Sequence, residues 1–298
     1  MQNGTQPKVT IGVPVYNGES YLGEALDCIL AQTFTDFEVL ISDNASTDRT
    51  QEICREYAAR DARITYIRHE VNAGAAPNFN LLIDRANGEY FKWAACDDLI
   101  DREYLEHCVA ALDANPKAVL ACPYATVIAA DGSFLREASP VPAPYAHASS
   151  LRRFGSLLSQ RTCYEVFGLI RLSQLRKTDG IVSSYYGDGV LLAQLAVLGP
   201  FEIVPKRLFF ARQHEQQSIN LLSDRAAYVR WFNSRRSGRF QLPMWRMLFE
   251  FARIPLRFRL QPFHRFKALA YVARFALRLR KPLFNDLISL FLSVTQRT

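Results

Sequence analysis

Apolar and polar positions alternate along the first 115 residues in a way that is typical of strands and helices taking turns. Four runs are typical of strands, and the first of them, 8–15 (KVTIGVPV), is nearly continuous in apolar and β-branched residues, as expected of a strand buried on both faces of a parallel sheet. Three segments between them repeat apolar residues at helical spacing. This alternation predicts an α/β fold with a mostly parallel central sheet that is flanked by helices. The expected strands are 8–15, 37–42, 63–68 and 90–95, and the expected helices are 18–31, 46–60 and 77–86.

The pattern becomes more varied after the fourth expected strand. A helix is expected at 101–115, where Pro116 ends it. A strand at 118–129 leads into Asp131-Gly132, which is a hairpin signal. These segments extend the expected sheet beyond its parallel part.

The remaining chain divides into two parts. A mixed pattern of strands and helices occupies 153–212, whereas apolar positions after Leu221 follow helical spacing to the end. We therefore expect an α/β domain at 1–220 and a helical C-terminal region at 221–298. Breaks in the helical region are expected at Pro243, Pro255, Pro262 and Pro282.

The positive charge of the chain is concentrated in its last sixty residues. The net charge is +7, but 239–298 alone holds twelve Lys or Arg against two acidic residues. The other residues hold 24 basic side chains against 27 acidic ones. The basic character therefore belongs to the C-terminal region and calls for a local explanation.

The cysteines and the first residues exclude several classes of protein. None of the six cysteines forms a C-x-x-C pair, so a zinc ribbon or a thiol redox motif is not expected. The segment 1–7 is short and polar, unlike a signal peptide, and no apolar run approaches the roughly 18 residues of a membrane span. We expect a cytoplasmic protein.

Three polar segments follow strands of the predicted sheet. Ligands of such sheets bind outside the carboxyl ends of the strands, so we expect the three segments to lie close together there. An aromatic ring can stack on a base, a carboxylate can accept an imide N–H, and carboxylates can hold a divalent metal that neutralises a diphosphate. Tyr16, Asp43 and the Asp97-Asp98 pair offer these functions in chain order. The segments are 14–19 (PVYNGE), 43–48 (DNASTD) and 96–98 (CDD).

Each of these aspartates also has a second interpretation, because an aspartate after a strand is often a turn former or a helix cap. Asp48 fits a cap better than a ligand site, and Asp97 and Asp98 are placed to cap the helix that begins near Asp101. The first segment is not the dinucleotide-binding fingerprint G-x-G-x-x-G, since its turn holds a single glycine. A dehydrogenase is therefore a poor fit.

Several separated motifs occur in order over about residues 8–215. They begin with PVYNGESYLGEALDCILAQTFTDFEVLISDNASTDRT and continue through Asn72-Ala73-Gly74, Asn78 and YFKWAACDDLI. In this order they resemble the family 2 glycosyltransferases of GT-A fold, which build bacterial polysaccharides and other glycans. The resemblance implies inverting transfer of a sugar from a UDP- or dTDP-sugar to a hydroxyl of a glycan or a lipid-linked saccharide.

The resemblance also implies which residues hold the nucleotide and the metal ion. The metal is expected to be Mn²⁺ or Mg²⁺, since carboxylate and diphosphate oxygens suit a hard divalent ion. The chain departs from the family at Ala95, where many members have an aspartate, so the identity of the direct ligand among Asp97 and Asp98 stays open. The implied nucleotide-binding residues are Pro14, Val15, Tyr16, Glu19, Asp43, Asn44, Asn72 and Asp97, and the implied metal ligands are Asp97, Asp98 and His214.

An inverting transfer needs a base that takes the proton of the acceptor hydroxyl. By the resemblance this base is Asp188, within YYGDG, although an aspartate between glycines also suits a helix N-cap. The same resemblance places Gly168 and Arg212 near the acceptor. Gly168 also fits a strand bulge, Arg212 also fits a phosphate contact, and Arg212 and His214 also fit a surface loop.

The basic C-terminal region has two interpretations. Lys267, Arg274, Arg278 and Lys281 share one helix face, and aromatic residues are interleaved with them. Such a helix can lie on an anionic membrane, which suits a lipid-linked acceptor and predicts a peripheral association through 239–298. Alternatively, the aromatic residues pack on the catalytic domain and the basic side chains form a solvated face.

Two other functions compete with sugar transfer. A nucleotidyltransferase would need a phosphate loop rich in Gly and Lys or Arg after the first strand, and this loop has no Lys or Arg. A membrane-associated protein that binds a nucleotide sugar without transferring it is compatible with Ala95. Nucleic-acid binding is not expected, because no recognised module is present and the rest of the chain is acidic.

Overall fold

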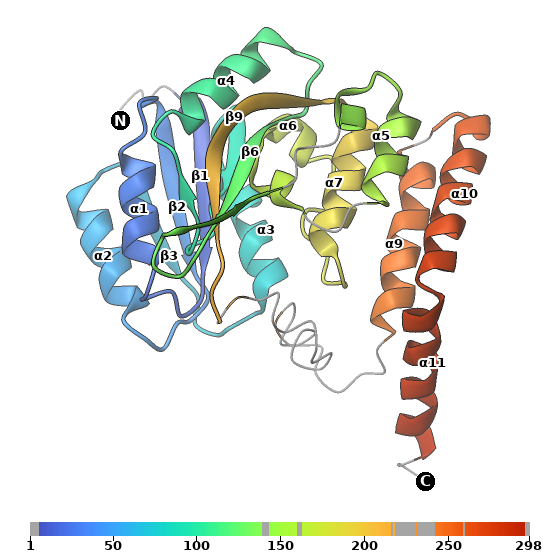
Figure 1. Cartoon of the computed structure of the whole chain (residues 1–298). Coiled ribbons are helices and arrows are strands. Elements are labelled where there is room, and N and C mark those ends of the chain that lie inside the picture. The colour runs from blue at the N-terminus through green and yellow to red at the C-terminus, as the bar shows by residue number, and fades with distance from the viewer. Residues whose placement is uncertain are drawn as a thin grey trace.

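The computed structural model describes residues 6–138, 143–159, 163–215, 217, 231, 242–258 and 260–295 (Figure 1). The N-terminal part alternates strands and helices as expected. Its elements are β1 (Val9–Val15), α1 (Leu22–Leu30), β2 (Phe37–Asp43), α2 (Thr50–Arg60), β3 (Ile64–Arg68), α3 (Ala75–Arg85) and β4 (Tyr90–Trp93).

The middle of the chain adds shorter elements and one long strand. These are β5 (Leu99–Ile100), α4 (Tyr104–Ala114), β6 (Leu120–Ile128), β7 (Phe134–Glu137), η1 (Ala143–Ala146), α5 (Ser150–Leu157), η2 (Tyr164–Phe167), β8 (Leu169–Arg171), α6 (Leu172–Leu175), α7 (Gly187–Leu198) and β9 (Phe201–Arg212). Three helices complete the described chain: α9 (Pro243–Arg257), α10 (Pro262–Arg278) and α11 (Arg280–Thr295).

Within the described residues the strands form one sheet in the order β3-β2-β1-β4-β8-β6-β9-β5, and β7 pairs with β6. The first four strands are all parallel, which confirms the predicted α/β sheet. β8 is antiparallel to both of its neighbours, whereas β9 runs parallel to β6. Parallel order places the carboxyl ends of β1, β2 and β4 side by side, with β1 pairing both other strands.

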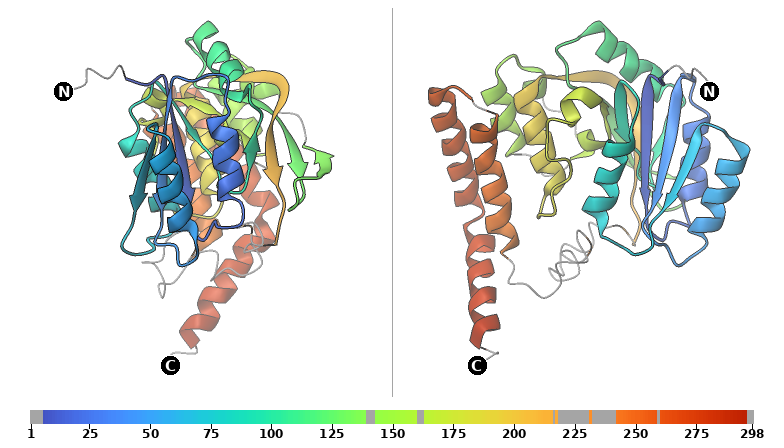
Figure 2. Two further views of the ribbon diagram at one scale, coloured as in Figure 1. Left: turned by 90° about the vertical axis from the view of Figure 1, so that its left-hand side faces the viewer. Right: turned by 180° about the vertical axis from the view of Figure 1, so that it is seen from behind.

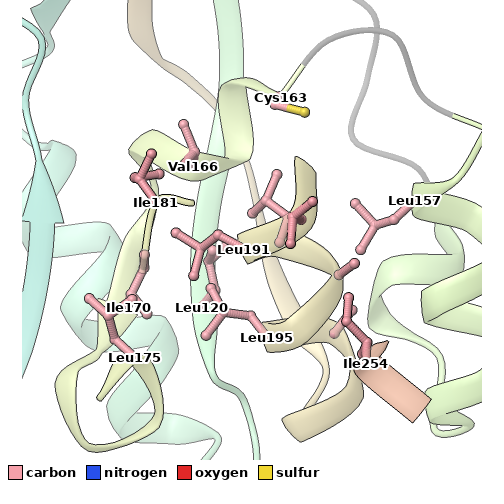
Figure 3. Close-up of a cluster of buried hydrophobic side chains, with 14 of the residues drawn as sticks. Leu120, Leu157, Cys163, Val166, Ile170, Leu175, Ile181, Leu191, Leu195 and Ile254 are labelled. Carbon is pink, nitrogen blue, oxygen red and sulfur yellow. The ribbon is translucent and has the colours of Figure 1, made fainter. Parts of the chain in front are cut away.

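Two hydrophobic cores lie on opposite faces of the sheet. Val9, Ile11 and Val13 of β1 are fully buried in the core that α1, α2 and α4 cover. The other face is covered by α3, α5, α7 and α9, and part of its core is drawn in Figure 3. Strands buried on both faces explain the nearly continuous apolar runs of the sequence.

The C-terminal helices pack beside α5 and α7, on the side of the molecule far from β3 (Figure 1). Phe251 and Ile254 of α9 are fully buried in the same core as Leu191 of α7. The predicted boundary at 220/221 lies outside the described residues. No helix in the described part of the chain is both long enough and apolar enough to span a lipid bilayer.

The prolines of this region behave differently from one another. Pro243 and Pro262 begin helices, as expected, because the missing N–H has no partner at a helix start. Pro255 lies inside α9, so the predicted break at this position is wrong. Pro282 lies in the first turn of α11, and α10 and α11 separate just before it, at Leu279, the C-cap residue of α10.

Candidate functional site

The loop after β1 is fastened to the loop after β2 by reciprocal hydrogen bonds. The backbone N–H of Asn17 donates to Ser46 Oγ over 2.9 Å, and the N–H of Thr47 donates to Asn17 Oδ1 over 2.9 Å. Asn17 (φ 53°) and Ala45 (φ 60°) both adopt the left-handed conformation that non-glycine residues seldom use. Tyr16 is 46% exposed at the tip of this assembly. The two loops thus form one preorganised edge with an accessible aromatic ring.

Glu19 and Asp48 add further hydrogen bonds between the loop after β1 and the loop after β2. The N–H of Glu19 donates to Asp48 Oδ2, and the N–H of Arg49 donates to Glu19 Oε2, each over 3.0 Å. Asp48 Oδ1 also accepts the N–H of Thr50, the first residue of α2, over 3.0 Å. Asp48 therefore satisfies the start of α2, as its cap interpretation predicts, and the Glu19 carboxylate supports the loop backbone.

Asp43 is fully buried at the end of β2. Its Oδ1 accepts the Ser46 N–H over 2.8 Å, while its Oδ2 accepts the Tyr66 hydroxyl over 2.7 Å and the Arg68 guanidinium over 2.5 Å. Burial alone would raise the pKa of Asp43, but the hydrogen bonds from Ser46, Tyr66 and Arg68 together lower it. Asp43 is thus an ionised anchor, and the side chain that it presents to solvent is Arg68, which is 33% exposed.

Asn44 ties the loop after β3 to this edge. Its Nδ2 donates to Asn72 Oδ1 over 3.0 Å, and its Oδ1 accepts the Ala73 N–H over 2.9 Å. Asn72 Oδ1 also accepts the Gly74 N–H over 2.8 Å. Asn44 and Asn72 therefore shape the loop that precedes α3, and Asn44 itself is 2% exposed.

The Asp97-Asp98 loop is docked onto the end of β9. The N–H of Arg212 donates to Asp98 Oδ1 over 2.9 Å, and Arg212 Nε donates to the carbonyl oxygen of Asp97 over 2.8 Å. The His214 Nε2 and Asp97 Oδ2 atoms lie 2.9 Å apart. At the start of α4 the N–H of Glu103 donates to Asp101 Oδ1, so Asp97 and Asp98 do not have to cap that helix. The fold thus joins two sequence-predicted metal ligands that are far apart in the chain.

Arg212 is only 2% exposed, although the sequence placed it near the acceptor. One guanidinium nitrogen donates to Glu24 Oε2 over 2.6 Å and the other donates to the carbonyl oxygen of Ala130 over 2.7 Å. The guanidinium also lies 4.9 Å from the ring centre of Tyr21, whose ring contacts that of His214 at 4.7 Å. Through these contacts Arg212 has a structural role, because it holds β9, α1 and the β6–β7 hairpin together around the Asp97-Asp98 loop.

The donor atoms at this loop fit a metal ion that arrives with a diphosphate. Within the described ranges no three His, Cys, Asp or Glu side chains are grouped closely enough to cage an ion by themselves. Mg²⁺ usually takes only one or two carboxylates from the protein and completes its shell with phosphate oxygens. Asp97 Oδ2 and His214 Nε2 offer such a partial set. Burial and the nearby Asp97 charge raise the pKa of Asp98. A bound cation would offset the repulsion between the two carboxylates and favour their ionised forms.

Asp188 lies in the first turn of α7, which begins at the same end of the molecule as the carboxyl ends of β1 and β2 (Figure 1). Its Oδ1 accepts the Gly189 N–H over 2.8 Å, as a residue at a helix start would. Tyr186, the N-cap residue, has a left-handed conformation (φ 60°). A side chain at Gly187 would clash with the Val182 carbonyl oxygen, and one at Gly189 would clash with the Tyr186 ring. Asp188 is therefore held rigidly between two sterically required glycines.

Gly168 lies between η2 and β8, where a Cβ atom would come within 2.7 Å of the Ala121 carbonyl oxygen. Close packing against β6 is thus a sufficient reason for glycine at this position. Three residues earlier, Glu165 is 8% exposed; the sequence placed it in a segment, 165–171, that resembles a family segment near the acceptor, but gave it no role of its own. Arg68, Tyr66, Tyr21 and Glu24 were missed as well. Nothing in the local pattern marks them, because their importance comes from partners elsewhere in the chain.

Comparisons with known proteins agree with this geometry. Residues 10–172, more than half of the chain, match the family described as Glycosyl transferase family 2. The chain is 40% identical over 99 residues to Glycosyltransferase GlyA of Streptococcus pneumoniae, covering 33% of this chain and 14% of that protein. It is 33% identical over 118 residues to the uncharacterized glycosyltransferase EpsJ of Bacillus subtilis, covering 40% and 34%. The matched segments thus span less than half of these relatives.

Solved structures share the fold over nearly the whole chain. S. aureus TarS, crystallised with UDP-GlcNAc, superposes with a TM-score of 0.66 at 19% identity over 95% of this chain and 80% of that one. The mannosyltransferase PcManGT from Pyrobaculum calidifontis, in complex with GDP-Man and Mn²⁺, gives 0.56 at 20% identity over 96% and 79%. Together with the matched family segment, the sheet order and the docked acidic loop, they lead to one conclusion. The chain belongs to glycosyl transferase family 2.

Proposed function

We propose that this chain transfers a sugar from a UDP- or dTDP-sugar to a hydroxyl of a glycan or of a lipid-linked saccharide, with inversion at the sugar. The observation that carries the proposal is the contact between the Asp97 carboxylate and the His214 imidazole, beside the hydrogen-bonded loops that follow β1 and β2. Family membership supports the reaction class. TarS was crystallised with UDP-GlcNAc and PcManGT with GDP-Man, so folds of this kind accept nucleotide sugars.

The donor nucleoside would lie on the edge formed by Pro14, Val15 and Tyr16. The Tyr16 ring is exposed and can stack on a base, whereas Asp43 is buried. Asp43 would therefore act on the pyrimidine ring chiefly by aiming Arg68, whose guanidinium it holds. A planar guanidinium can donate to base carbonyls or to phosphate oxygens.

A divalent cation, Mn²⁺ or Mg²⁺, would be held by Asp97 and His214, with Asp98 beside them. When bound, it would stabilise the negative charge of the departing diphosphate. Arg212 would contribute indirectly, because its backbone N–H and its Nε fix the carboxylate of Asp98 and the carbonyl of Asp97. The PcManGT complex contains Mn²⁺, which supports this choice of ion.

Asp188 would serve as the base. As the acceptor oxygen bonds to the anomeric carbon, the bond from that carbon to the diphosphate breaks, and the hydroxyl proton passes to the Asp188 carboxylate. Burial raises the pKa of Asp188, which makes its carboxylate a stronger proton acceptor. Its rigid place between Gly187 and Gly189 would keep the base aligned.

Donor hydrolysis in the presence of Mn²⁺ tests the transfer scheme, because water can replace the unknown acceptor. Asp97→Ala and Asp98→Ala should each lower the Mn²⁺-dependent rate by at least about tenfold, the scale seen for metal-site substitutions. Asp84→Ala, an exposed change on α3, is the matched control and should leave the rate unchanged. A rate that needs no metal, or that survives Asp98→Ala, would overturn the scheme. Tight binding of the donor with no hydrolysis or transfer would favour a nucleotide-sugar-binding protein.

The C-terminal helices support a second part of the proposal, a peripheral association with an anionic membrane. α10 and α11 turn Ala268, Val272, Leu283 and Asp286 inward, and these side chains are at most 7% exposed. The opposite side of both helices, which we call the outer face, carries large apolar side chains that are 41% to 74% exposed. They are Phe263, Phe266, Leu277, Phe284, Ile288 and Phe291.

The positive charge of α10 and α11 favours an anionic membrane, rather than another protein, as the partner of the outer face. Their described residues carry six Lys or Arg, and the single acidic residue, Asp286, is buried and accepts the N–H of Met244. Each basic side chain near an anionic surface contributes about 1 kcal/mol, and exposed aromatics can enter the headgroup region. α11 also projects beyond the α/β domain, where a flat surface could reach it (Figure 2). The basic residues are Arg265, Lys267, Arg274, Arg278, Arg280 and Lys281.

Sedimentation with phosphatidylglycerol vesicles tests the membrane proposal on the full chain. Deleting 239–298 would be a poor test, because α9 supplies buried core residues. The pair Phe266→Ser and Phe284→Ser should weaken sedimentation several-fold, while Phe134→Ser, equally exposed on β7, should not. Vesicles of neutral phosphatidylcholine should bind the unaltered chain weakly. Equal binding by the outer-face variant and the unaltered chain would contradict the proposal.

A further inference from the structure

A buried group of titratable side chains surrounds Asp188. Cys163 lies close enough to the Asp188 carboxylate and to the Tyr186 hydroxyl for these groups to influence one another's pKa. Glu165 follows two residues later on η2, which packs directly on α7. Tyr145 of η1 lies in the same group and is fully buried.

Glu165 occupies an unusual place in this group. It is 8% exposed, and its Oε2 atom is buried without a hydrogen-bond partner among the described residues. The hydroxyl of Tyr145 is likewise buried and unpartnered. In the described chain no Lys, Arg or His forms an ion pair or hydrogen bond with Glu165. Four titratable groups lie close enough to Glu165 for a charge on one member of the pair to shift the pKa of the other. They are Tyr145 from η1, Cys122 from β6, Cys163 beside η2 and Asp188 from α7.

Two carboxylates in such surroundings cannot both be charged cheaply. Desolvation penalises each charge, each charge repels the other, and no Lys, Arg or His among the described residues is paired with either carboxylate. The two groups are not equivalent, because the Asp188 carboxylate accepts the Gly189 N–H at a helix start that favours negative charge. The Oε2 atom of Glu165 has no such donor. The proton should therefore stay on Glu165.

The raised pKa of Glu165 is consistent with a side chain that stays protonated at this buried position. Burial raises the pKa of Glu165 to about 7, its own backbone N–H opposes this in part, and the nearby Asp188 charge adds to the rise. Burial also raises the pKa of Asp188, but the Gly189 N–H and the Cys163 thiol lower it in part. Near neutral pH the group would thus hold one proton and one charge.

We propose that Glu165 and Asp188 form one carboxyl pair that holds a single proton at neutral pH, with Glu165 as the protonated member and Asp188 as the ionised one. Glu165 is then a positioning residue that keeps its own proton throughout the reaction, and the acceptor proton goes to Asp188. The functional half of this inference rests on the proposed role of Asp188 as the base. The turn that carries Glu165 is pinned from behind, since Lys92 Nζ donates to the Phe167 carbonyl oxygen over 2.6 Å.

Isotope-edited infrared spectroscopy of the full chain, labelled with ¹³C in its glutamate carboxyl groups, tests the pair directly. A protonated glutamate band should be present at pH 6 and should disappear in Glu165→Gln, which keeps the size and the neutral charge of the protonated side chain. In Asp188→Asn the same band should titrate at a lower pH, because the neighbouring charge is gone. Glu70→Gln, an exposed change, should leave the band in place. A band that is missing at pH 6, or that titrates unchanged in Asp188→Asn, would overturn the pair.

The pH dependence of donor hydrolysis supplies the functional readout. The unaltered chain and Glu165→Gln should have the same rate below about pH 6 and different rates above about pH 8, where only the unaltered chain carries the second charge. Identical profiles at all pH values would show that Glu165 has no influence on the base. A shifted infrared band together with full activity of Asp188→Asn would keep the pair and reject Asp188 as the base, so the two failures are distinguishable.

Discussion

The carboxylate of Asp97 and the imidazole of His214 meet at 2.9 Å although 117 positions separate them in the chain. Asp97 follows β4 near the middle of the sheet, and His214 follows β9. The contact exists because Arg212, at the end of β9, bonds to the backbone of Asp97 and to the side chain of Asp98. Two residues of β9 and its exit, Arg212 and His214, thus complete a site that the parallel half of the sheet begins.

His214→Ala should raise the Mn²⁺ concentration needed for half-maximal donor hydrolysis by about 10- to 100-fold, because the ion would lose one of its two best-placed protein ligands. The measurement is a Mn²⁺ titration of the rate. His107→Ala, on the surface of α4, serves as the control and should leave the Mn²⁺ dependence as it is. An unchanged Mn²⁺ requirement in His214→Ala would remove His214 from the metal site.

Asp188→Asn should lower the transfer or hydrolysis rate by about 10²- to 10⁴-fold, since an amide accepts no proton. Binding of UDP, measured by calorimetry with Mn²⁺, should change little because the nucleotide edge is built from other loops. Equal losses in binding and rate would mean that the substitution damages the fold around α7 instead of removing the base.

Asp43→Asn should destabilise the fold by about 1–3 kcal/mol, because Tyr66 and Arg68 would lose a buried carboxylate partner. The folded pKa of Asp43 lies below its ordinary value of 3.8, so its contribution is present above pH 3.8 and is lost as the pH falls through the folded pKa. Urea unfolding of the two chains at pH 7 measures the difference. If Asp43→Asn unfolds at the same urea concentration, the anchoring role is wrong.

Lys92 is fully buried in β4, where its ammonium group donates to two carbonyl oxygens and lies 4.4 Å from the ring centre of Tyr104. Burial lowers its pKa to about 8, so the folded chain releases this proton more easily than the unfolded chain does. Stability should therefore rise as the pH increases from about 8 towards 10.5, by up to roughly 3 kcal/mol. Lys92→Met should flatten this rise in denaturant titrations. A slope that persists in Lys92→Met would assign the effect to other groups.

Glu165 should give the opposite trend at lower pH, where the stability of the fold should fall as the pH rises from 4.5 towards 7. Its folded pKa of about 7 lies above its ordinary value of 4.5, so its contribution is full below pH 4.5 and is lost as the pH rises towards 7. The loss is at most about 3 kcal/mol. Glu165→Gln should reduce the fall in melting temperature between pH 5 and pH 7. An identical fall in both chains would contradict a buried, protonated Glu165.

The local pattern of the chain was sufficient for the first four strands and their helices. Strands such as β1 are apolar throughout because both faces are covered, and the helices between them repeat apolar residues on one side. The same order put Asp43 and the Asp97-Asp98 pair at the carboxyl ends of strands in one parallel sheet, which predicted their shared edge. These inferences needed only periodicity and the rules of parallel sheets.

The partners of those residues were decided by tertiary structure. Periodicity carries no information about which distant side chain will meet Asp43 or Asp97, so Arg68 was missed and Arg212 was expected to face an acceptor. Pro255 was misjudged for a related reason, since packing against the core keeps α9 helical through this position at a local cost. Likewise, the raised pKa of Glu165 depends on burial and on the charge of Asp188 in α7, which only the folded chain brings near it.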